Sequence, residues 1–234
     1  MYVLEASLEN EAGALELQKG NVAYALETFQ NALDILNQLR QLPFLPPFDP
    51  KRDREPQNCI SVDVPYIKND RFFCYHRALI FPRNSDPTCC STTTRQRPPP
   101  VCSVHRLAFY SCVVLQNMAL AYHMLGQALK NDQNLSMSLF YYSESLKMAR
   151  GLPINLESAD ADLLRVVALN NSAAILRHRM DFYGASMAMD EIRSKLRHAL
   201  VIHRHSSRAF PKEDIEGFIL NTMEALPPTG AAVA

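Results

Sequence analysis

Glycine, excess charge of one sign and long apolar runs are all scarce in this chain of 234 residues. Its seven glycines are isolated, and the Gly-x-x-x-x-Gly-Lys phosphate loop does not occur. The 24 basic side chains equal the 24 acidic ones, which argues against a dedicated nucleic-acid binder. No run of about 18 apolar residues occurs, so we expect no membrane-spanning helix. Because 47% of the residues are hydrophobic, the chain can bury a core.

Catalytic motifs are missing as well. There is no Gly-x-Ser-x-Gly or His-Glu-x-x-His, and no cysteine or histidine sits in a recognisable catalytic context. We therefore expect that the chain is not an enzyme and uses no cofactor or small-molecule substrate. An enzyme of unrecognised type is an alternative. The amino terminus lacks the basic-then-apolar pattern of a secretory signal, so we expect an intracellular, cytoplasmic location.

Five of the six cysteines lie between residues 59 and 102, without any Cys-x-x-Cys pair. Cys74-x-His76 and Cys102-x-x-His105 could together supply four zinc ligands. The cysteines are too few for a disulfide-stapled scaffold, and we favour reduced thiols in and around a loop with no bound metal. A zinc-binding regulatory subunit is the second alternative function.

Prolines divide the chain. Eleven of the fifteen lie in residues 43–100, and because proline lacks an amide donor they end the first helical stretch. Within this insertion, residues 60–64 alternate apolar with polar, which is the period of a half-buried strand. Residues 72–81 are aromatic and β-tolerant, and residues 68–71 could form a turn. The pattern predicts a short β-hairpin in an insertion that is otherwise poorly ordered, notably at residues 83–100.

Everything outside the insertion is predicted to be helical. Apolar residues recur at three- and four-residue spacing, with short breaks between paired segments. The predicted helices are residues 2–19, 22–41, 104–126, 134–150, 160–179 and 182–203. Pro211, followed by acidic residues, signals the start of a last helix. The sequence thus predicts an all-α fold of three antiparallel helix pairs and a C-terminal helix.

Small and aromatic residues recur at fixed offsets in these pairs. The first pair has Gly13, Ala25, Phe29 and Ala32, the second has Ala119, Ser138, Tyr142 and Ser145, and the third has Ala173, Ala185, Met189 and Ile192. The turn of the second pair, at the polar residues 131–134, is predicted to carry roughly seven extra residues. The pattern resembles the tetratricopeptide repeat (TPR), a helix-turn-helix unit of about 34 residues, over about half the chain. Three unrelated helix pairs with generic small-large packing are the alternative.

The resemblance implies an α-α superhelix of three TPR-like pairs with a C-terminal capping helix and a Pro-rich insertion between pairs one and two. It divides the chain into segments with distinct roles. We place pair one at residues 1–42, the Pro/Cys-rich insertion at 43–103, pairs two and three at 104–205, and the capping helix and tail at 206–234.

TPR proteins usually bind extended peptides or helices in a concave groove that the first helix of each pair lines. The resemblance therefore implies a protein-interaction module or scaffold whose partner is another protein. The implied groove residues are Asn10, Leu17, Gln116, Asn117, Leu120, His123, Asn170, Asn171 and Arg177. One TPR subfamily holds the terminal carboxylate of chaperones with basic groove residues. Asn10, Val167 and Asn171 stand at those basic positions, so this ligand is not expected.

Three of these residues, Asn117, Asn170 and Asn171, are polar on otherwise apolar helices. Asparagine is unfavourable inside a helix unless its amide has a partner. The amides either satisfy backbone groups within the repeat stack or bind the main chain of a peptide in the groove. The sequence leaves both interpretations open.

Charge is unevenly distributed although it sums to zero. Residues 177–208 hold seven Lys and Arg against three acidic residues. This basic stretch could contact an acidic partner, RNA or a membrane surface. A solvated helix face is the favoured interpretation, because few aromatic residues are interleaved with the basic ones to stack on bases.

Overall fold

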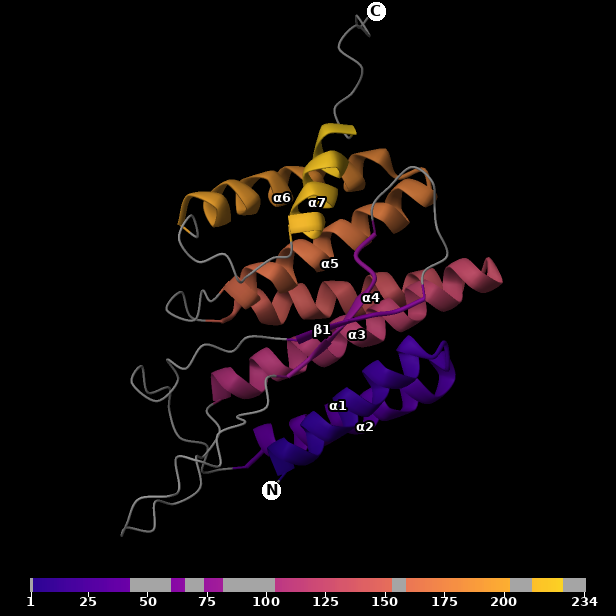
Figure 1. The fold of residues 1–234 in the computed structure, drawn as a ribbon, viewed down its shortest axis with the longest axis vertical. Helices are drawn as coiled ribbons and strands as arrows, with labels where there is room; N and C mark the ends of the chain where they lie inside the picture. The colour runs from indigo at the N-terminus through magenta and orange to yellow at the C-terminus, as the bar shows by residue number, and fades with distance from the viewer. Residues whose placement is uncertain are drawn as a thin grey trace, which may run out of the picture.

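The computed structural model of this chain describes residues 2–42, 60–65, 74–81, 104–152, 159–202 and 212–224. Within these ranges the protein is mostly helical, as the sequence predicted (Figure 1). The helices are α1 (Tyr2–Gln18), α2 (Val22–Arg40), α3 (Val104–Leu129), α4 (Asp132–Arg150), α5 (Ala159–His178), α6 (Phe182–Ile202) and α7 (Lys212–Glu224). The strands are β1 (Ile60–Asp63) and β2 (Arg77–Ile80).

The six long helices form three pairs in chain order. Helix α1 packs on α2, α3 on α4, and α5 on α6, and the pairs meet where α2 contacts α3 and α4 contacts α5. The first helices of the pairs also touch one another, α1 with α3 and α3 with α5. They therefore line one side of the stack, along which the two strands run (Figure 1).

The turns inside the three pairs share one geometry. Each turn contains one residue whose backbone is in the left-handed conformation. These residues are Gly20 (φ 84°), Lys130 (φ 49°) and Met180 (φ 63°). The next residue donates its N–H to the carbonyl five positions back, in the bonds Asn21–Glu16, Asn131–Gly126 and Asp181–Leu176, all 2.9 Å long. This bond satisfies a carbonyl that the end of a helix leaves without a partner. A link of two or three residues with the same hydrogen bond thus closes each pair.

The extra residues of the second pair lie in its helices and not in its turn. Ser138 Oγ donates to the carbonyl of Ala119 at 2.8 Å, so these two positions face each other as the repeat pattern predicted. Beyond them α3 and α4 both continue toward the short turn, and seven residues shared by two helices add about one turn to each. The expectation of a longer turn at residues 131–134 was therefore wrong.

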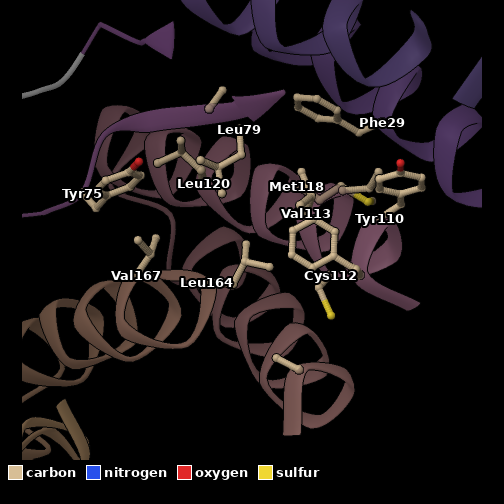
Figure 2. Close-up of a cluster of buried hydrophobic side chains, with 14 of the residues drawn as sticks. Phe29, Tyr75, Leu79, Tyr110, Cys112, Val113, Met118, Leu120, Leu164 and Val167 are labelled. Carbon is tan, nitrogen blue, oxygen red and sulfur yellow. The ribbon is translucent and has the colours of Figure 1, made fainter. Parts of the chain in front are cut away.

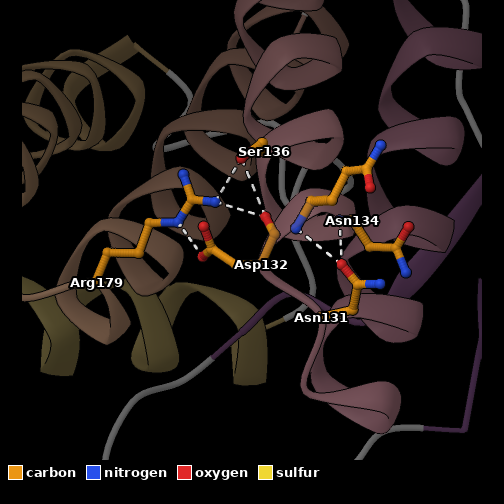
Figure 3. A network of polar contacts seen from close by, with 6 residues as sticks. Asn131, Asp132, Asn134, Ser136 and Arg179 are labelled. Atoms are coloured by element: carbon orange, nitrogen blue, oxygen red, sulfur yellow. Dashed lines mark hydrogen bonds and ion pairs between the residues drawn. The ribbon is translucent and has the colours of Figure 1, made fainter.

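Those polar residues begin α4. Asn131 is its N-cap, and its Oδ1 accepts hydrogen bonds from the backbone N–H of Gln133 and Asn134 (Figure 3). Arg179, which follows α5, donates through Nε to Asp132 Oδ1 at 2.8 Å and through Nη2 to the carbonyl of Asp132 at 2.7 Å. The polar run therefore caps a helix and ties the second pair to the third.

The close approach of α1 and α2 depends on small residues. A Cβ atom at Gly13 would lie 2.5 Å from Phe29 Cε1, which no real packing tolerates, and Ala25 and Ala32 are fully buried. Residues of this size let the two helix backbones come together while Phe29 fills the space beside them. The offsets seen in the sequence thus correspond to real contacts in this pair.

The two strands pair in antiparallel orientation, as the sequence predicted. Ile60 lies opposite Ile80, and Asp63 lies opposite Arg77. The predicted turn at 68–71 and the segment 83–100 lie outside the described residues. In the part of the chain that the structure describes, no helix combines the length and the hydropathy needed to cross a membrane.

Candidate peptide groove

Residues 74–81, here called the groove segment, occupy the side of the stack lined by the first helices. Its strand β2 contacts α1 and α3. Apart from His76 and Arg77, which are partly buried, its residues are no more than 9% exposed. The repeat pattern predicted a partner peptide on this face, and an extended segment of the chain itself lies there.

Asn117 of α3 binds both main-chain groups of one residue in this segment. Its Oδ1 accepts from the N–H of Leu79 at 2.8 Å, and its Nδ2 donates to the carbonyl of Leu79 at 2.7 Å. Asn10 of α1 donates to the same carbonyl at 2.9 Å and accepts from Asn117 Nδ2 through its Oδ1. Both asparagines are fully buried, so these bonds satisfy groups that water cannot reach.

Asn171 of α5 makes the same contact four residues earlier in the segment. Its Oδ1 accepts from the N–H of Tyr75 at 2.8 Å, and its Nδ2 donates to the carbonyl of Tyr75 at 2.9 Å. The Nδ2 also donates to the hydroxyl of Tyr142 on α4, at 3.0 Å. Two asparagines on neighbouring first helices thus bind residues spaced by four.

The asparagines occupy the edge of β2 that β1 leaves uncovered. In an antiparallel pair, alternate residues direct their N–H and C=O groups toward the partner strand and away from it. His76, an even-numbered residue, accepts from Val64 on the side of β1. Tyr75 and Leu79 are odd-numbered and bond the asparagines instead. Since a side-chain amide carries the donor and acceptor of a peptide group, the asparagines replace a third strand.

Apolar contacts hold the segment from its faces. Figure 2 shows Tyr75 and Leu79 directed toward Leu120 and Val167 of the first helices. At the far end, the ring of Phe81 lies against Tyr110 with 4.4 Å between centroids. Rings at this distance attract each other beyond the effect of area burial. The groove therefore combines main-chain hydrogen bonds with pockets for particular side chains.

Helix α7 completes the groove at its α5 end. Phe218 is fully buried and stacks on Tyr75, with ring centroids 6.1 Å apart. Asn221 donates to Asn170 Oδ1 at 2.7 Å, and Asn170 Nδ2 donates to Asn171 Oδ1 at 3.2 Å. From the sequence we expected α7 only to cap the stack, and both of these contacts went unpredicted. Asn221, a polar residue among the apolar residues of α7, was the sequence signal that could have indicated a contact between α7 and the groove.

The other predicted groove residues play less direct parts. Leu17 and Leu120 are buried apolar side chains, and Arg177 is partly buried. Gln116 is 2% exposed, and its amide has no hydrogen-bond partner among the described residues. His123 is buried beside the ring of Tyr142 and shares a 3.1 Å hydrogen bond with Gln127. That these residues bind a partner stays a prediction.

Burial controls the titration of two groups near the groove. It lowers the pKa of His123 to about 4, with the nearby His178 adding to the shift. Burial also raises the pKa of the Cys112 thiol to about 12, against smaller opposing effects of Arg165 and Arg40. Cys112 is therefore a neutral thiol at physiological pH, which does not suit a nucleophile.

The structure describes only some of the residues that the sequence offered as zinc ligands. Cys74 is buried in the groove segment, and its carbonyl lies 3.2 Å from His76 Nδ1. Cys102 lies outside the described residues. Among the residues that the structure does describe, no three His, Cys, Asp or Glu side chains gather as metal ligands would.

Comparisons of this chain with family models, curated proteins and solved structures find no match.

Proposed function

We propose that this chain is a non-catalytic protein-interaction module, a TPR-like superhelix whose concave groove binds extended peptides. One observation carries the proposal. Asn117 and Asn171 each bond both main-chain groups of a residue in an extended segment. Side-chain amides placed in this way hold main chain of almost any sequence, which is what a peptide groove requires.

The form of the helix stack supports the TPR-like assignment. The turns that close the three pairs share one backbone geometry, and small residues stand where Gly13 and Ser138 meet the facing helix. Both features favour a repeated unit. Repeats of this kind create an extended concave surface along their first helices. The asparagines lie on α1, α3 and α5, which are those helices.

Buried polar groups in the groove also favour binding over a purely structural role. A groove meant only to be filled would gain more from apolar side chains, because buried amides add net stability only when every group is paired. Gln116 has no partner among the described residues although it is 2% exposed. The repeat pattern counts Gln116 among the groove residues, and there its amide would offer a donor and an acceptor to an incoming ligand.

The experiment is selection of phage-displayed 12-residue peptides on the immobilised full chain. We expect peptides that bind saturably and whose affinity falls at least tenfold on the variant Asn117→Asp, because a carboxylate repels the carbonyl that the amide bonds. Asn131→Asp is the matched control: it makes the same chemical change at a helix N-cap, where aspartate serves equally well. Selected peptides that bind both variants alike, or no binders at all, would refute the groove as a site for external peptides.

A further inference from the structure

We infer that the groove segment is a replaceable internal ligand, and that the partner is an extended peptide with an aromatic residue followed, four positions later, by leucine. The inference rests on the proposed function and deepens it. The native segment shows which positions the groove reads: Tyr75 against Phe218, Leu79 beside Asn117, and Phe81 against Tyr110. A third apolar position, ideally aromatic, therefore follows two residues after the leucine.

The spacing follows from where the asparagines lie. Four residues of extended chain span roughly 13 Å, and both bonded residues must present their main chain to the same edge. Residues four apart satisfy this parity, whereas residues three or five apart do not. A partner must also run in the direction of the segment, with its aromatic residue over α5 and its leucine between α1 and α3.

The segment's attachment to the helices supports replacement. Between Leu42 and Ile60, and again between Phe81 and Val104, the chain has enough residues to bridge tens of ångströms when extended. Because loop entropy changes slowly with length, these long connections add little to the free-energy cost of leaving the groove. Among the described residues, the segment has main-chain hydrogen bonds to β1 and the adjoining Val64, and side chains make its polar contacts to the helices. An incoming peptide can form those same contacts.

The charge of a peptide should have little influence on whether it binds in the groove, and this limits the chemical class of the partner. Among the described residues, neutral amides and apolar side chains hold Tyr75 and Leu79, and the ion pair of the segment joins Arg77 to Asp63 of β1 and not to the helices. Binding should therefore depend little on salt, in contrast to recognition of an acidic or phosphorylated segment. The partner is an apolar, aromatic segment of another protein.

The test is competition between the segment and a synthetic copy of residues 74–81 that carries Cys74→Ser and a fluorescent label. Fluorescence anisotropy measures its affinity for the full chain and for the full-length variant Leu79→Ala, whose internal copy is weakened. We expect the variant to bind the peptide at least tenfold more tightly, because its competitor dissociates more readily. Adding Asn171→Asp to that variant should reduce the affinity at least tenfold, and adding Asn131→Asp should not.

Three outcomes would contradict the replacement of the groove segment by a peptide from another protein. A folded Leu79→Ala variant that fails to bind the peptide would refute replacement. If Leu79→Ala and a second variant, Tyr75→Ala, both lose their helical circular dichroism, the segment is integral core and the inference is wrong. A stable dimer by light scattering, with segments exchanged between copies, would make a second copy the occupant and overturn the partner assignment.

The inference and the proposed function can fail separately. If the phage selection yields groove binders without the aromatic-to-leucine spacing of four, the function stands and the inference falls. If the peptide copy binds in the groove while selection yields nothing, the segment is replaceable, but the chain has no external peptide partner. Binding at 0.5 M salt distinguishes an apolar partner from a charged one, because only the charged one would lose affinity.

Discussion

The helix pairs and the groove segment are held by different kinds of contact. Within a pair, small residues such as Gly13 admit the facing helix, and Phe29 fits a space shaped for it. In the groove, Asn117 and Asn171 bond main chain, which every sequence provides. The first interface depends on the identity of each side chain, and the second depends chiefly on extended conformation and correct spacing. The exchange that we propose for the groove segment would break contacts of the second kind and leave those of the first kind in place.

The largest expected effect comes from removing Asn117. In Asn117→Ala, the N–H of Leu79 and the Oδ1 of Asn10 lose their partners while buried, so we expect a loss of roughly 4 kcal/mol in the free energy of unfolding. Urea denaturation measures this loss. Hydrogen exchange at the Leu79 amide should accelerate more than exchange in α4. Equal acceleration in both would show that the segment and the stack open as one unit.

The pH dependence of stability tests whether His123 is buried as a neutral imidazole in the helix stack. Its pKa is about 4 in the folded protein, below the ordinary 6.5, so the unfolded chain binds the proton first as the pH falls. Stability should therefore decline between pH 6.5 and 4, by roughly 3 kcal/mol from this group. The variant His123→Gln should lose this part of the pH dependence in denaturant titrations. A slope identical to that of the parent protein would contradict the burial of a neutral imidazole.

Overpacking tests the side-chain interface of the first pair. Ala25 is fully buried, and replacement by phenylalanine should destabilise the protein by about 2 kcal/mol, because the helix backbones cannot separate freely. Thermal unfolding provides the measurement. Ala23→Phe is the control, since that position is exposed and should barely shift the melting midpoint. Matching shifts in the two variants would show that the first pair does not pack closely at Ala25.

The smallest expected effect is at the cap of α4. Asn131→Ala removes the acceptor of two backbone N–H groups, which should cost about 1 kcal/mol. Chemical denaturation should show this loss, and Asn131→Asp should restore most of it. Peptide affinity should stay unchanged in both variants, since the cap lies outside the groove. A change in affinity would mean that this turn is coupled to peptide binding.

The helices were predictable because their signal is local. Apolar spacing gave each of the six long helices to within a few residues, and the alternating pattern of residues 60–64 gave a strand. The error lay at residues 131–134, where a polar run resembled a loop. Asparagine and aspartate favour both loops and helix N-caps, so composition alone could not distinguish a long turn from Asn131 capping a longer helix.

The groove was predictable only in part, because its contacts join distant parts of the chain. The asparagines stood out as polar residues on apolar helices, and the sequence analysis considered main-chain binding for them. The occupant could not be foreseen, since Leu79 lies 38 residues from Asn117, and Tyr75 lies 96 residues from Asn171. No local pattern records such a pairing. The part of α7 in the groove, through Phe218, was missed for the same reason.

The alternation along β2 makes the groove sensitive to length as well as to sequence. Deleting or inserting one residue between Tyr75 and Leu79 would turn one of them toward β1 and leave an asparagine facing the wrong atoms. Similar changes beyond Ile60 or Phe81 would leave this alternation intact. Natural insertions and deletions should thus occur on both sides of residues 75–79 and not within them. The distance between the two bonded residues stays constant, while the lengths of the flanking connections can vary.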